Sequence, residues 1–184
     1  MEVVNKRVAA AQQTRSTLIE TGLVLAEELG LEGLSVNAVV VAAGVSKGTF
    51  FHHFPDRVSY LVALHRRFHD VLFDEVMAVI GEMAPGKDRL AVAAATYLDG
   101  CLRDRGVKAL LLEARGHLPI AEEVTRRNRM NVDVVAADLE VLGARHPREA
   151  ARLWIAATAE CALMELERGR RDPAARSALN EFVQ

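Results

Sequence analysis

The apolar residues of this chain recur at the period of an α-helix, and this periodicity constrains the fold more than any other feature. In the first such stretch, residues 14–29, one helix face carries Leu18, Gly22, Leu25, Ala26 and Leu29. Alternating apolar and polar runs are absent, and all five prolines fall between helical stretches, where proline is tolerated. We therefore predict an all-α fold of about nine helices, over residues 14–29, 35–43, 46–52, 56–80, 88–104, 107–115, 119–142, 147–168 and 173–182.

Composition narrows the class of protein. The chain has 184 residues, 51% of them apolar and 26% charged, with a formal net charge of −2. This is enough apolar material for one domain or two small ones, and it argues against disorder. No apolar run is long enough for a membrane span, and the first residues lack a secretory signal. Because the two cysteines, Cys101 and Cys161, form no CxxC motif or disulfide framework, we expect a cytoplasmic protein.

The most informative segment is 35–57, SVNAVVVAAGVSKGTFFHHFPDR. Ser35 and Ser46 each precede a short helical stretch and can accept hydrogen bonds from its first free N–H groups. Gly44 lies between the two stretches, where a left-handed turn favours a residue without a β-carbon. Two capped helices joined by a short glycine turn predict a helix-turn-helix.

The second of these helices is predicted to present a face suited to an anionic groove. Val45, Phe50 and Phe54 occupy its inward positions. Small or polar residues face outward, and residues 33–55 contain no acidic side chain. Such a face favours contact with DNA phosphates and base edges. The outward residues are Ser46, Lys47, Gly48, Thr49 and His52.

This segment resembles the DNA-binding helix-turn-helix of the TetR family of transcriptional regulators. The family's usual run is Ala-Gly-Val-Ser-Lys-Gly-Thr followed by an aromatic residue, His-Phe and Pro. Here the run is Ala43 to Thr49 followed by Phe50 to Pro55, and Thr14-Arg15, Gly30 and the Leu34–Val36 stretch also match in place. The resemblance implies a DNA-binding domain over 1–57 and an effector-binding and dimerisation domain over 58–184.

The resemblance also implies how DNA contacts divide. Ser35 and Arg57 are expected on phosphates, Asn37, Lys47 and Thr49 at base edges, and His52 at either. Ser46, Gly48 and Phe51 complete the expected interface. Three positions depart from the family pattern: Phe51 lacks the hydroxyl of the usual Tyr, Val40 replaces Ala, and Arg57 replaces Lys. Ser35 and Ser46 would cap their helices whether or not they touch DNA, and His53 is equally explained by packing on Phe54.

For the rest of the chain the resemblance implies a small-molecule effector, a homodimer, and a pseudo-palindromic operator whose binding is relieved by the effector. The apolar surface of 147–168 exceeds what one helix face can hold, so we expect this helix and 173–182 to form the dimer interface. An apolar or aromatic effector is expected, because the domain offers few inward charges. Its candidate contacts, each also explicable as core packing, are Leu98, Cys101, Leu102, Leu112, Arg115, His117, Trp154, Thr158 and Cys161.

Two other interpretations remain open at this point. His65 and His69 stand at the i, i+4 spacing that can bind one metal ion, which would make the protein a metal-sensing repressor. A helical ligand carrier that does not bind DNA is the second. We expect no enzyme activity, no cofactor and no resident metal, because no catalytic spacing of acids and histidines is recognisable and no strand precedes the Ser46–Thr49 run.

Overall fold

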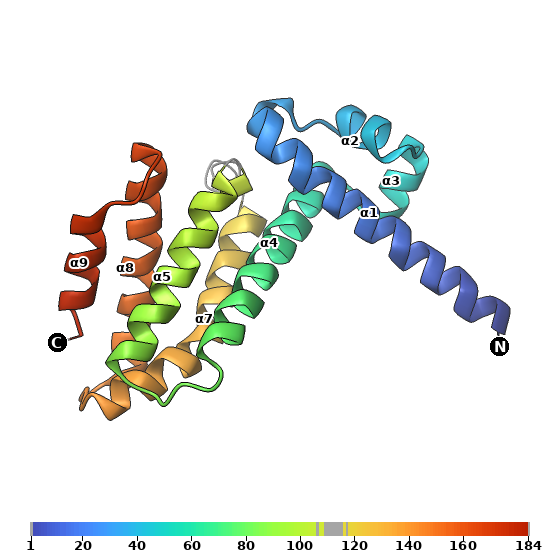
Figure 1. Ribbon diagram of the computed structural model, residues 1–184. Helices are drawn as coiled ribbons and strands as arrows, with labels where there is room; N and C mark the ends of the chain where they lie inside the picture. Colours follow the sequence, from blue (N-terminus) through green and yellow to red (C-terminus); the bar gives the residue numbers. More distant parts are fainter. Residues whose placement is uncertain (1, 106, 109–115, 117, 184) are drawn as a thin grey trace. The chain divides into compact units, whose positions relative to one another are not determined.

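The computed structural model describes residues 2–105, 107–108, 116 and 118–183 (Figure 1). These residues confirm the all-α prediction: they contain eight helices and no strand. The predicted helix over 107–115 lies outside the described residues apart from its first two. The helices are α1 (Glu2–Gly33), α2 (Val36–Ala43), α3 (Lys47–His53), α4 (Arg57–Ile80), α5 (Lys87–Arg103), α7 (Leu118–Val141), α8 (Pro147–Arg168) and α9 (Pro173–Glu181).

The chain divides into two compact units. One comprises the described residues of 1–68 and 106–121, and the other those of 69–105 and 122–183. Helices α4 and α7 each contribute residues to both units. The predicted division after residue 57 is a division by function, and it stays a prediction. No helix in the described part of the chain has the length and apolarity needed to cross a membrane.

Helix α1 is longer than its apolar face predicted. It begins at Glu2 instead of near Thr14, and it continues through a kink at Gly30, where φ is 65°. Residues 6–13 are exposed, so no apolar stripe marks this part of the helix. Its alanines, glutamines and basic residues are good helix formers, and this local preference extends α1 beyond the part that packs.

The first unit is organised around Tyr60 of α4. Leu18, Phe50 and Leu61 are fully buried, and Tyr60 is 2% exposed. The Tyr60 hydroxyl donates a 2.6 Å hydrogen bond to the carbonyl oxygen of Leu18 in α1, and burial raises the pKa of this phenol. Gly22 of α1 lies directly against the same ring. One side chain therefore joins α1, α3 and α4.

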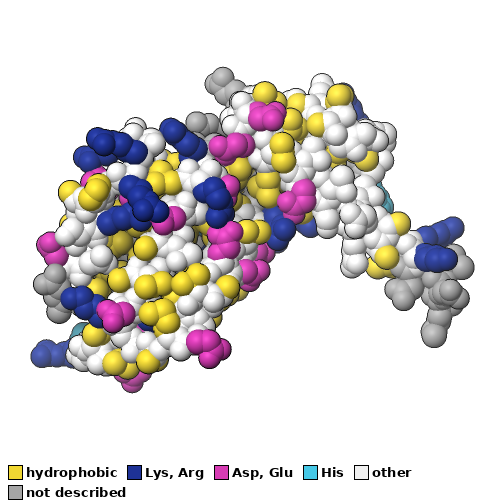
Figure 2. All heavy atoms as spheres, viewed as in Figure 1, with side chains coloured by type: hydrophobic (Ala, Val, Ile, Leu, Met, Phe, Trp, Pro, Cys, Tyr) yellow, Lys and Arg dark blue, Asp and Glu magenta, His cyan; other side chains and the backbone are white. Residues whose placement is uncertain are grey.

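The second unit is held together by ion pairs as well as apolar packing. Basic and acidic side chains are interspersed over its surface (Figure 2). Glu165 of α8 has no exposed surface, and it receives hydrogen bonds of 2.6 and 2.8 Å from Arg176 of α9. Asp138 of α7 accepts from Arg89 at 2.6 Å and from the N–H of Gly86 at 2.8 Å. These buried carboxylates connect α5, α8 and α9 to their neighbours.

Candidate DNA-binding site

Two capped helices and a left-handed turn form the helix-turn-helix as predicted. The Ser35 hydroxyl accepts a 3.1 Å hydrogen bond from the N–H of Ala38, and the Ser46 hydroxyl accepts one of 3.0 Å from the N–H of Thr49. Gly44 has φ 66°, and its N–H returns to the last carbonyls of α2. The two caps and the left-handed turn therefore fix where α2 begins and ends and where α3 begins.

An aromatic cluster packs on the buried side of α3. Phe50 and Phe54 are 0% and 2% exposed, as predicted for the inward positions. Their ring centroids lie 5.5 Å apart, and each lies within about 5.0 Å of the Tyr60 ring. Val45, also expected inward, is half-buried. Close aromatic packing of this kind leaves α3 little freedom to shift relative to α4.

The opposite face of α3 lies in solvent. Ser46, Lys47, Gly48 and His52 are exposed, as predicted. Phe51 is 49% exposed, although it is aromatic, and its ring stands edge-on to Phe50. The structure thus brings Lys47, Gly48, Phe51 and His52 onto one stripe at i, i+1, i+4 and i+5. Thr49 is half-buried, and its hydroxyl lies 2.9 Å from that of Ser46.

The remaining predicted contact residues lie before and after α3 in the sequence. Ser35 and Asn37 are exposed at the start of α2. Arg57 is half-buried, and its Nε donates a 3.1 Å hydrogen bond to the carbonyl of Leu34. Arg57 therefore fastens the start of α4 to the turn before α2, a structural role beside the predicted phosphate contact.

Sequence reasoning matched Arg15 to the family pattern but did not predict its contact near the end of α3. The Arg15 guanidinium of α1 lies 5.0 Å from the centroid of the Phe54 ring, a distance typical of a cation–π contact. His53 lies between Phe54 and His52, with centroid distances of 6.5 and 5.2 Å. Its packing on Phe54 agrees with the structural interpretation. No sequence signal connects Arg15 to α3, because only the fold brings them together.

Gly48 gives the first test of this face. A β-carbon added there would meet only the Ser46 hydroxyl, at 3.6 Å, so packing within the protein does not require glycine. We expect Gly48→Ala to raise the free energy of unfolding by about 0.5–1 kcal/mol, because alanine is the better helix former. If DNA approaches this backbone closely, the same variant binds DNA more weakly. Urea unfolding and DNA titration check the two effects, and a variant that binds DNA as well as wild type would remove Gly48 from the interface.

His53 makes the stability of this unit depend on pH. Burial, then His52 and Arg15, lower the pKa of His53 below its ordinary value of 6.5. The unfolded chain therefore binds a proton at His53 more readily than the folded chain does. The contribution of His53 to the stability of the folded state is present in full above pH 6.5. This contribution is lost as pH falls through the lower pKa that His53 has in the folded state. We expect stability measured by urea unfolding to decline below pH 6.5, and less steeply in His53→Gln. Equal slopes for the two proteins would contradict this assignment.

The predicted effector contacts lie mainly in the packed interior of the second unit. Leu98 and Cys101 on α5 and Trp154, Thr158 and Cys161 on α8 are each at most 8% exposed. Leu102 is half-buried. Burial is the main cause that raises the pKa of the Cys161 thiol. Leu112, Arg115 and His117 lie outside the described residues, so a pocket formed by this set stays a prediction.

The metal interpretation is not favoured. His65 is 3% exposed and His69 is half-buried. The described residues contain no group of three or more His, Cys, Asp or Glu side chains that could hold a metal ion. A structural metal site normally needs four such ligands, and this pair at i, i+4 supplies two.

Two capped helices joined by a glycine turn, of which the second presents an exposed face without acidic residues, define a helix-turn-helix protein. Comparison with known proteins gives the family. Residues 18–64 match the bacterial regulatory proteins of the tetR family. This part of the chain is therefore similar to the DNA-binding region of the TetR family, as the resemblance implied.

Individual relatives agree with this assignment. The transcriptional repressor KstR2 of Rhodococcus jostii (strain RHA1) is 24% identical over 65% of this chain and 58% of its own length. The transcriptional regulator CymR of Pseudomonas putida is 29% identical over 67% of this chain and 63% of its own. The chain thus aligns with about three fifths of each relative. A transcriptional regulator from Saccharomonospora viridis, solved in complex with choline, shares the fold with a TM-score of 0.74 and 21% identity, over 94% of this chain and 96% of that one.

Proposed function

We propose that this protein is a ligand-responsive transcriptional regulator that binds a pseudo-palindromic DNA operator as a homodimer in the cytoplasm. The observation that carries the proposal is the exposed stripe of α3, where Lys47 and His52 flank Gly48 without an acidic neighbour. A short helix can enter the major groove when one face packs firmly on the rest of the protein and the opposite, polar face is exposed. The half-sites would lie ~34 Å apart, or a multiple of that, if two copies present α3 to successive grooves.

The proposed dimer uses α8 and α9. Leu153 of α8 is 73% exposed and Phe182, directly after α9, is 77% exposed. Apolar side chains this exposed on neighbouring elements are typical of surfaces that a partner covers. A second copy is the expected partner, because a two-fold axis is what relates the two halves of a palindromic operator.

The proposed regulation is repression relieved by a small apolar or aromatic effector in the second unit. The name of one relative, a repressor, supports repression. The choline bound to another relative supports a small-molecule ligand, while the apolar or aromatic character rests on the composition of the domain. Effector binding would act through α4, because α4 is continuous from Arg57 to Ile80 and contributes to both units. A helical ligand carrier without DNA binding is the competing function.

Selection of bound fragments from random or upstream genomic DNA tests the proposal. A regulator should enrich a two-fold symmetric sequence, and its affinity should fall steeply as salt rises, because binding releases counterions from the phosphates. A ligand carrier should enrich no sequence and show no salt-sensitive affinity. Absence of enrichment at low salt would therefore overturn the DNA-binding proposal.

Lys47→Ala tests the role of the central residue of this face. We expect operator affinity to fall about tenfold, since one contact of a basic side chain with a base or phosphate contributes ~1–3 kcal/mol. Folding and dimerisation should not change, because Lys47 is exposed. Lys87→Ala, at an exposed position at the start of α5, is the matched control. Affinity equal to wild type in Lys47→Ala would exclude this lysine from the interface.

A further inference from the structure

The N-terminal part of α1 is basic, and most of it lies outside the packed core of its unit. We call residues 6–15 the α1 arm. Lys6, Arg7 and Arg15 are exposed and form no ion pair or hydrogen bond with any residue in the described part of the chain. The sequence has no acidic residue from position 3 to position 19. Figure 1 shows the arm extending past α2 and α3, and basic side chains gather at this end of the chain in Figure 2.

The α1 arm starts from the end of α3. The Arg15 guanidinium lies 5.0 Å from the centroid of the Phe54 ring, and Phe54 is the C-cap residue of α3. Within α1 the backbone departs from helical angles only at Gly30, so the arm continues as regular helix from this contact. Arg7 stands about 12 Å beyond Arg15, because an α-helix rises 1.5 Å per residue. Arg7, Ala11 and Arg15 follow one another at i, i+4 and i+8 along one face of the helix.

The chemistry of the arm indicates a polyanion as its partner. Val8 is its single large apolar residue, whereas a helix that binds a membrane or an apolar groove needs a broad apolar face. Guanidinium groups bind phosphates through paired N–H donors. The phosphates of one DNA strand recur about every 3.4 Å along the duplex axis. Two guanidinium groups about 12 Å apart can therefore reach separate phosphates.

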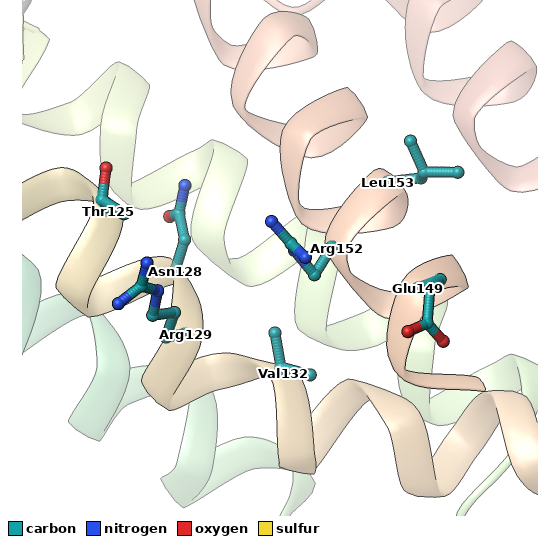
Figure 3. A pocket seen from close by; sticks show the side chains of 7 residues that line it. All are labelled: Thr125, Asn128, Arg129, Val132, Glu149, Arg152 and Leu153. Carbon is teal, nitrogen blue, oxygen red and sulfur yellow. The ribbon is translucent and has the colours of Figure 1, made fainter. Parts of the chain in front are cut away.

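Two exposed arginines elsewhere in the chain belong to a surface that already has a proposed partner. Arg129 of α7 and Arg152 of α8 line a groove of about 520 Å³ (Figure 3). Glu149 and Leu153 of α8 also line it, and Leu153 lies on the surface proposed for the dimer. A second copy would cover this side of the groove. The dimer does not account for the cations of the α1 arm, which belong to the other unit.

We propose that the α1 arm is a second DNA contact, in which Arg7 and Arg15 bind backbone phosphates beside the half-site that α3 contacts. This inference rests on the proposed function, since α3 must hold the operator before the arm can reach its flank. The arm adds affinity and salt dependence. It adds no sequence preference, because phosphate contacts carry no direct sequence information.

Arg7→Gln and Arg15→Gln, singly and together, test this contact. The probe is the duplex enriched by selection, prepared with and without about one helical turn of flanking DNA at each end. Each lost phosphate contact should lower the slope of log K against log salt concentration by about 0.9 per protomer. The double variant should therefore lose about 1.8 per protomer on the flanked duplex and bind it at least about tenfold more weakly at low salt. Preference for the operator over a scrambled duplex should not change.

Two controls separate charge from packing. Arg145→Gln, exposed and in the other unit, should bind both duplexes as the wild type does. Arg15→Gln also removes the contact with Phe54, so Arg15→Lys, which keeps the charge, is measured beside it and should retain most of the slope. A loss in Arg15→Lys equal to that in Arg15→Gln would assign Arg15 to packing and remove it from the contact. Circular dichroism should show each variant folded as the wild type.

The outcomes distinguish this inference from the proposed function. If the wild type binds the operator with a steep salt dependence and Arg7→Gln and the double variant do the same, the arm contact is wrong and the regulator remains. If the wild type binds no duplex in a salt-sensitive manner, both proposals fail. A defect of equal size on the duplex without flanks would place the contact inside the half-site and contradict the flanking position.

Discussion

Replacement of Glu165 by alanine is expected to lower the free energy of unfolding of the second unit by about 3–5 kcal/mol, the usual cost of breaking a buried ion pair from one side. The Glu165 carboxylate is fully buried and accepts two hydrogen bonds from Arg176 and a third, of 2.9 Å, from the N–H of Asp172. Its removal leaves both donors without this acceptor. The Arg176 guanidinium keeps Asp99, 2.8 Å away, which limits the loss.

The cost should be large because these groups are shielded from water. The Glu165 hydrogen bonds are the main cause that holds the pKa of Arg176 above its ordinary value. Arginine stays charged at neutral pH even without such a partner, so removal of Glu165 leaves a charged guanidinium behind. Asp172 is also the N-cap of α9, where its side chain accepts from the N–H groups of Ala174 and Ala175. Loss of Glu165 therefore loosens the start of α9 as well as the ion pair.

Trp154 makes the measurement selective. It is the chain's single tryptophan, and it is 6% exposed on α8, so its fluorescence in urea reports unfolding of the second unit. Glu167→Ala, exposed two residues further along the same helix, is the matched control and should change stability by less than about 0.5 kcal/mol. If the two variants unfold at the same urea concentration, the buried network contributes no net stability.

Gly22→Ala should destabilise the first unit by about 1–3 kcal/mol through overpacking. A β-carbon at this position would overlap the Tyr60 hydroxyl and lie 2.8 Å from Cζ of the same ring. The ring has little room to move away, because its hydroxyl is hydrogen-bonded to the carbonyl of Leu18 and the ring packs edge-to-face with Phe50 and Phe54. The helix preference of alanine, about 1 kcal/mol, is too small to offset this clash.

Hydrogen exchange is the suitable measurement, since Trp154 lies in the other unit. The amides of α1 and α4 around Leu18 and Tyr60 should exchange faster in Gly22→Ala. Gly48→Ala is the matched helical glycine, and there the predicted change in stability has the opposite sign. Protection in Gly22→Ala equal to that of wild type would show that α1 and α4 can separate at no cost.

Local signals predicted the helix-turn-helix well. Ser35, Gly44 and Ser46 act on backbone groups within five residues of themselves, so their positions in the sequence suffice to place the caps and the turn. The inward positions of Phe50 and Phe54 follow from helical periodicity alone. The exposed stripe of α3 was predictable for the same reason.

Contacts between distant residues were not predictable in this way. Helix α1 extends to Glu2 without an apolar stripe to mark it. Arg15 meets Phe54 across 39 residues of chain, and Arg176 meets Glu165 from a different helix. None of these residues differs in type or spacing from an ordinary solvated charge.

The amino-acid sequence by itself determined the helical class, the caps, the turn and the polar face of α3, because backbone hydrogen bonding and helical periodicity act over a few residues. Tertiary structure alone decided which side chains meet across helices: the Tyr60 contact with Gly22 and the burial of Glu165 against Arg176. These depend on how helices pack, and packing is set by side-chain shapes that no local pattern records.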